Sequence, residues 1–183
     1  MKLNFKTAFN YPFNRPKGML NILWILLPII GWFVLGGYLI RIVQGFIKGK
    51  FRQLPQLNFK DNLNLGFFMF LKSIPFILAY MVVMGSLNTI SLWVGIPIRI
   101  LLEIFVVPIL FINFFNKETV QSLFEFKIIK VVYNNLGDYI LVILKSIALA
   151  FIFLIMIIIL VGIPAGSFTK NIFLADFYRR KIK

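Results

Sequence analysis

The chain contains no cysteine and no histidine, and only six of its 183 residues are acidic. Without cysteine it can form no disulfide, no thiolate nucleophile and no zinc–thiolate site. Without histidine it can form no Ser-His-Asp triad, no imidazole general base and no histidine metal site. The few carboxylates do not pair on a shared polar face. The sequence therefore predicts a protein that is not an enzyme and that needs no cofactor and no resident metal.

Apolar side chains are what the chain has in abundance. Hydrophobic residues make up 60% of the sequence, and the mean hydropathy is +0.91, well above that of ordinary soluble domains. Leu20–Ile40, Ser73–Ile98 and Ser146–Thr169 are uncharged, and each exceeds the roughly 20 residues needed to cover a hydrocarbon core. These runs do not alternate polar with apolar residues, as barrel strands must. We therefore expect an all-α integral membrane protein.

Basic residues outnumber acidic ones by twenty to six, which gives a net charge of +14. Basic segments beside apolar runs orient a membrane protein and attract anionic lipid headgroups. The predicted partners are thus membrane lipids with anionic headgroups, and nucleic acid is not expected. Within the loop after the first apolar run, Lys48, Lys50 and Arg52 are the candidate contacts to anionic lipid.

The order of polar and apolar segments predicts a single membrane domain, a helical-hairpin bundle with about four to six membrane helices and Pro-Gly turns. Its expected parts are an interfacial leader (1–18), a first hairpin or span (19–45), a second hairpin (66–116), an interfacial amphipathic helix (117–138) and a third hairpin or span (139–178). For residues 117–138, a helix packed on the neighbouring loop is the alternative. In the leader, Phe5 and Phe9 have the spacing of a short interfacial helix, and a disordered leader is the alternative.

Pro28 interrupts the first apolar run, so Leu20–Ile40 is either one span or a hairpin that turns near Pro28–Gly31. The fragments LKSI and VGIP each occur twice, which favours repeated hairpins whose return begins at VGIP. Four plain spans would divide the seventeen flanking cations nine to eight, whereas three hairpins place all seventeen on one side. The positive-inside rule favours the hairpins, with both termini cytoplasmic.

Four charges lie inside apolar segments, and they form the candidate intramembrane polar site: Lys72, Arg99, Glu103 and Lys145. Arg99 and Glu103 are four residues apart, on one face of a helix, so they can pair. Such a pair stabilises helix packing, or lines a positively charged cavity for a small anion or headgroup together with one of the lysines, or relays protons through Glu103. Lys72 and Lys145 are each near a helix end, from which a lysine can reach the headgroups.

Four stretches resemble a known family: NYPFNRPKG, LPIIGWFVLGGYLIRIVQGFIKG, LPQLNFKDN and PILFINFFNKETVQSLFEFKIIKVVYNNLGDYI. Their order is similar to that of the small, largely archaeal membrane proteins called domain-of-unknown-function family 4013. The resemblance covers nearly the whole chain and implies a polytopic membrane protein, with no functional residues to transfer. The turns PIIGW and VGIPAGSF are more faintly similar to those of CysZ-type sulfate permeases, whose hairpins partly penetrate the membrane.

Two functions remain as hypotheses for a multi-pass protein of the cell membrane. The first is a non-enzymatic component that organises the membrane or binds a partner, either a second copy of itself or another membrane protein. The alternative is a passive channel or permease for a small solute, such as an anion. The sequence names neither the solute nor the partner.

Overall fold

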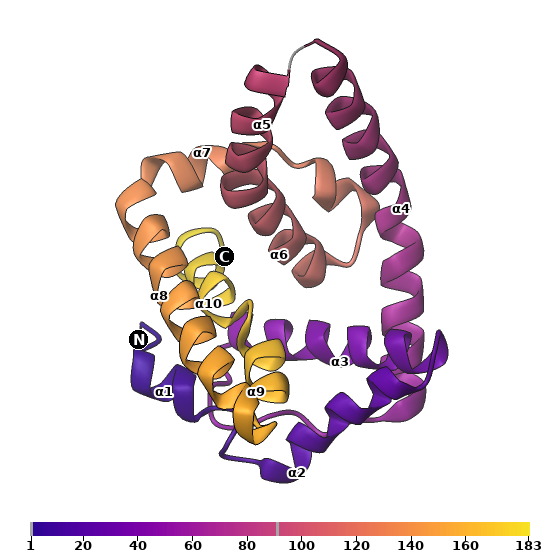
Figure 1. Cartoon of the computed structure of the whole chain (residues 1–183), viewed down its shortest axis with the longest axis vertical. Helices are drawn as coiled ribbons and strands as arrows, with labels where there is room; N and C mark the ends of the chain where they lie inside the picture. The colour runs from indigo at the N-terminus through magenta and orange to yellow at the C-terminus, as the bar shows by residue number, and fades with distance from the viewer. Residues whose placement is uncertain (1, 91) are drawn as a thin grey trace.

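A computed structural model describes residues 2–90 and 92–183, and at positions 88–90, 92 and 94 only the backbone is described. The side chain of Asn88, at the predicted connection of the second hairpin, and Ser91 lie outside the described part. Every regular element among the described residues is helical, without a strand, which confirms the predicted all-α class. Figure 1 shows the arrangement.

The elements, in chain order, are α1 (Phe5–Asn10), α2 (Pro16–Met19), the 3₁₀ segment η1 (Leu20–Leu26), α3 (Ile30–Ile47), α4 (Phe59–Ile90), α5 (Leu92–Leu101), the π-helical segment η2 (Leu102–Val106), α6 (Val107–Lys117), the 3₁₀ segment η3 (Val120–Phe124), α7 (Lys127–Asn134), α8 (Leu136–Ile155), the 3₁₀ segment η4 (Met156–Ile159), α9 (Gly162–Thr169) and α10 (Ile172–Lys181).

Four stretches of helix in the described part are long and apolar enough to cross a membrane: Ile30–Ile47, Phe59–Leu87, Gly95–Lys117 and Leu136–Ile159. The last three bury only about a fifth of their residues or fewer inside the protein, as helices that face lipid do. Most of α3, by contrast, is enclosed by protein. The chain is thus a membrane-embedded helical bundle built around α3.

The first apolar run is not one straight helix. Between η1 and α3 the chain turns through Pro28 and Ile29, and Ile29 has a left-handed backbone with φ 64°. The indole N–H of Trp32 donates to the carbonyl oxygen of Ile25 at 3.1 Å, which holds η1 against the start of α3. The chain therefore reverses inside this run, close to the position of its proline.

Two further reversals follow. In Figure 1, α4 rises to a tip, and α5, η2 and α6 return from it. Later α8 and η4 run outward, Leu160 turns the chain with φ 59°, and α9 packs back against α8. The helix α4 begins at Phe59, seven residues before the predicted start at Gly66. Its polar first turn is helical because the N–H of Asn62 already bonds to the carbonyl oxygen of Asn58 at 2.9 Å.

The centre of the fold is α3, which packs against α4, α6 and α10. The crossing of α3 and α4 is close because two glycines meet there. A Cβ atom at Gly37 would lie 2.0 Å from the carbonyl oxygen of Asn62, and one at Gly66 would lie 1.9 Å from that of Phe33. Bulkier residues at these positions would separate the two backbones.

The segment 117–138 differs from the single amphipathic helix that its spacing predicts. The structure divides it into η3 and α7. The amide of Asn113 donates to the carbonyl oxygen of Ser122 at 2.8 Å, and Leu123 is fully buried, so η3 is folded back onto α6. Tertiary contacts to α6 therefore compete with a continuous helix.

The leader forms a short helix, and its aromatic side chains contact the rest of the protein. Phe5 and Phe9 do lie on a short helix, α1, but their rings face protein. Phe5 stacks on Phe173 of α10, with ring centroids 6.2 Å apart, and Phe9 stacks on Phe153 of α8 at 5.6 Å. Both pairs attach the leader to the last hairpin.

Candidate functional site

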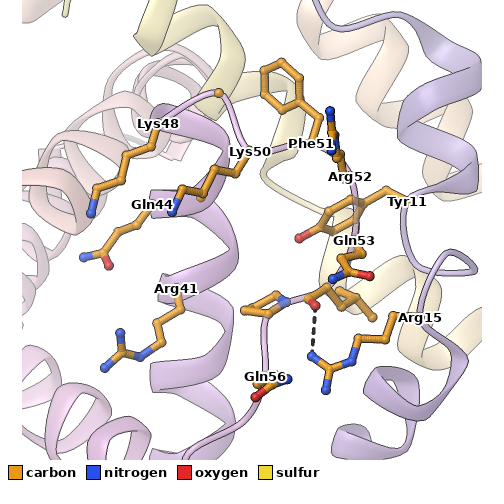
Figure 2. Close-up of a pocket in the computed structure, with 14 residues that line it drawn as sticks. Tyr11, Arg15, Arg41, Gln44, Lys48, Lys50, Phe51, Arg52, Gln53 and Gln56 are labelled. Carbon is orange, nitrogen blue, oxygen red and sulfur yellow. Dashed lines mark hydrogen bonds between the residues drawn. The ribbon is translucent and has the colours of Figure 1, made fainter.

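A basic pocket lies between the leader and the C-terminal half of α3. It has a volume of about 590 Å³. Figure 2 shows α3 on one side, α1 and α2 on the other, and the segment 50–56 running between them. The lining residues include every member of the predicted lipid-contact set, Lys48, Lys50 and Arg52.

The loop that carries these cations begins with a tight helix end. Gly49 has φ 76°, a backbone conformation that glycine adopts without strain. The N–H of Lys50 bonds to the carbonyl oxygen of Gly45 at 2.8 Å, and that of Gly49 to Phe46 at 3.0 Å. These N–H groups close the helix and are not directed at a ligand. The N–H groups of Gly49 and Lys50 are therefore used within the chain.

Two contacts from the leader hold the far end of the loop. The amide of Asn14 donates to the carbonyl oxygen of Arg52 at 2.6 Å, and the guanidinium of Arg15 donates to that of Leu54 at 3.2 Å. The side chain of Leu54 is fully buried and touches Gly18. The loop is thus anchored on both sides of its basic segment.

Five cations line the pocket, because Arg15 and Arg41 join the three of the loop. Arg41 projects from α3 and donates through Nε to Asn62 Oδ1 at 2.8 Å. Among the described residues, no carboxylate forms an ion pair with any of the five. The pocket is therefore an uncompensated positive site.

The acidic residues form their contacts with groups other than the five cations or are exposed, and Glu118 reaches the pocket wall through the amide of Gln44, a lining residue. Their contacts are Glu103 with Arg99, Glu125 with Lys117, Asp138 with Lys2 and Arg180, Asp176 with Arg179 and Arg180, and Glu118 with the amide of Gln44. Asp61 is exposed on α4. Hydrogen bonds from Lys117 and Asn113 hold the pKa of Glu125 below its usual range. In the described part, no three carboxylates gather into a metal site.

Tyr11 contributes a neutral donor to the pocket wall. Its ring packs edge-on against Phe46, with centroids 4.7 Å apart, and is almost fully buried. Burial raises the pKa of its hydroxyl, and the proximity of Tyr38 adds to the effect. The hydroxyl therefore stays protonated at physiological pH and can donate a hydrogen bond to an anion.

The last helix, α10, contacts the loop that carries the pocket cations. Asp176 is buried and accepts hydrogen bonds from Arg179 at 2.6 Å and from Arg180 at 3.0 Å. Arg179 in turn lies over the ring of Phe51 in the pocket loop, 5.2 Å from its centroid. Burial alone would lower the pKa of Arg180, but its hydrogen bonds to Asp138 and Asp176 raise it on balance.

The predicted intramembrane set is only partly brought together. Arg99 Nε donates to Glu103 Oε1 at 2.8 Å, and the hydroxyl of Tyr80 donates to the same oxygen at 3.1 Å. Lys72 instead donates to the carbonyl oxygen of Glu118 at 2.8 Å, at the other end of the hairpin. Lys145 is half-buried on α8. Among the described residues, no hydrogen bond or ion pair therefore joins this pair to either lysine.

Sequence reasoning missed Arg15, Arg41 and Tyr11 as pocket residues. Arg41 could have been identified from the sequence, because it is the only charge within the apolar run LGGYLIRIV. A charge at such a position is expected to have a polar partner inside the protein. Arg15 and Tyr11 carried no such signal. They reach the pocket only because the leader folds back against α3 and the loop.

Comparison with known proteins gives one family. The model of the family described as "Protein of unknown function (DUF4013)" matches residues 20–162 of the chain. No curated protein and no solved structure matches it.

Proposed function

This chain belongs to the DUF4013 family, and we propose that it is a non-enzymatic multi-pass protein of the cell membrane that binds the phosphate group of anionic phospholipids in its basic pocket. The observation that carries the proposal is the convergence of five cations without a carboxylate counter-ion in the described part. Arginine and lysine are the usual ligands of phosphate in proteins. Binding of this kind would order anionic lipid around the protein.

Contacts between distant segments support a topology in which both termini and the basic loops share the cytoplasmic side. Asn14 contacts Arg52 at 2.6 Å, and Arg179 lies 5.2 Å from the ring centroid of Phe51. Four plain spans would put the leader and α10 opposite this loop, across a hydrocarbon core of about 30 Å. The contacts favour three hairpins, and the positive-inside rule favours the cytoplasm for the shared side.

Cysteine labelling tests this topology. The sequence has no cysteine, so only the introduced thiol of the protein can react. Single cysteines at Asn14, Gln53, Gln121 and Lys183 should all resist an impermeant maleimide in intact cells and react after permeabilisation. A cysteine at Asn88 should react in intact cells. Labelling at Asn14 but not at Gln53 from outside would restore the four-span arrangement.

Lipid binding is tested with the purified protein in nanodiscs that contain phosphatidylglycerol or phosphatidylcholine. We expect the protein to retain phosphatidylglycerol through detergent extraction, as counted by native mass spectrometry. The variant with Lys48→Gln, Lys50→Gln and Arg52→Gln should lose roughly ten- to a hundredfold in affinity, since each cation near an anionic surface contributes about 1 kcal/mol at most. Raising the salt concentration should also lower the affinity of the wild-type protein for phosphatidylglycerol.

The matched control removes three cations outside the pocket, Lys60→Gln, Lys127→Gln and Lys130→Gln. It has the same net charge as the pocket variant, so it isolates position from total charge. Equal lipid retention by the two variants would contradict the proposed site. Sulfate flux through liposomes that contain the wild type, abolished in the pocket variant, would instead establish the anion-permease alternative.

A further inference from the structure

The upper part of the second hairpin exposes a charged pair on a membrane-spanning face. In Figure 1 the tip of α4 and α5 rises beyond the other helices. Arg99 and Glu103 lie within the candidate span Gly95–Lys117, yet their side chains are 58% and 46% exposed. Charged groups inside membranes almost always face protein or water. This face therefore requires a cover that the single chain does not supply.

The hydrogen-bonding capacity of the pair is only half used. Arg99 engages Glu103 Oε1 through Nε alone, and Tyr80 donates to the same carboxylate oxygen. Among the described residues, neither the Nη groups of Arg99 nor Glu103 Oε2 has a partner. A guanidinium has five donors and a carboxylate two acceptor oxygens, so both groups can accept a second partner from outside.

Apolar side chains surround the pair and share its helix face. Ile96 is three residues before Arg99 and Ile100 is three residues before Glu103, and these isoleucines are 54% and 50% exposed. On α4, Met81 and Val82 are exposed beside Tyr80. The surface is thus an apolar helix face with a cation and an anion at its centre.

We propose that a second copy of this chain covers this face, with Arg99 of each copy donating to Glu103 of the other across a two-fold axis. A two-fold interface brings one patch against itself, so it is closed only if that patch is complementary to itself. A patch with one cation and one anion meets this condition. A partner that offered only acids would leave Glu103 Oε2 without a donor, and one that offered only bases would leave the Nη groups of Arg99 without an acceptor. This inference is independent of the lipid pocket, which lies on other elements.

Cross-linking in liposomes tests the interface. The sequence has no cysteine, so Ile100→Cys introduces the only thiol, and mild oxidation should trap a disulfide dimer. The matched control is Ile158→Cys. Ile158 is 86% exposed and lies next to the turn of the third hairpin. A preformed interface holds its thiols at high effective concentration, so the first variant should cross-link at least about tenfold faster than the second. Equal rates would overturn the proposal.

Charge variants on the Ile100→Cys background separate contacts between copies from contacts within one copy. Arg99→Glu or Glu103→Arg alone should reduce cross-linking about tenfold or more, because like charges then oppose each other. When the two variants are co-expressed with different tags, the mixed dimer should recover cross-linking, as should the double variant that exchanges the two charges. A mixed dimer no better than either single variant would show that the pair acts only within one chain.

Discussion

Replacing Asp176 by alanine is expected to lower the free energy of unfolding by about 3 kcal/mol, because the partly buried Arg179 and Arg180 lose the carboxylate that they share and Arg180 keeps only Asp138. Asp176 is 2% exposed and accepts hydrogen bonds from Arg179, Arg180 and the N–H of Leu3. Its loss therefore releases both the leader and the end of α10. The change is measured as a shift in the thermal unfolding of the detergent-solubilised protein.

Asp61→Ala provides the control for this variant. It removes the same side chain from an exposed position at the start of α4, where loss of a surface carboxylate costs about 0.5 kcal/mol or less. Asp176→Ala should also weaken lipid retention, because it removes the carboxylate that helps to orient Arg179 over Phe51 beside the pocket. Equal unfolding temperatures for the two aspartate variants would contradict the central role of the Asp176 network.

Replacing Gly37 by alanine is expected to separate α3 from α4 and to cost about 3 kcal/mol, near the upper end of the range for overpacking. The added Cβ would lie 2.0 Å from the carbonyl oxygen of Asn62, which is backbone and cannot rotate away. Because α3 carries Arg41 and one wall of the pocket, lipid retention should fall with the stability.

The adjacent Gly36 is the control, because a Cβ there meets nothing within 4 Å. Gly36→Ala should be neutral or stabilise the protein by up to about 1 kcal/mol, since alanine favours helix over glycine. Thermal unfolding of the two variants, one residue apart on the same helix, gives the comparison. A Gly37→Ala variant as stable as Gly36→Ala would mean that the helices do not cross at this glycine.

The basic character of the candidate site was predictable from the sequence, but the full set of residues that line it was not. Lys48, Lys50 and Arg52 stand together in the sequence, and a basic loop beside an apolar run predicts contact with anionic lipid. Their enclosure in a pocket with Arg15 and Arg41 depends on the leader, which is attached by Asn14 and by aromatic contacts to α8 and α10. Periodicity within one segment carries no information about such distant contacts.

What the sequence by itself determined is the class of protein, an all-α one. Uncharged runs longer than the bilayer core can satisfy their backbone groups in lipid only as helices, and Arg99 and Glu103 pair because four residues bring side chains to one helix face. Tertiary structure alone decided the segment 117–138, the course of the leader and the partner of Lys72. In each case the local preference was weak, so packing decided the result: η3 bends because Leu123 is buried and Ser122 bonds to α6, and Lys72 turns to Glu118 because the end of α6 offers a free carbonyl oxygen.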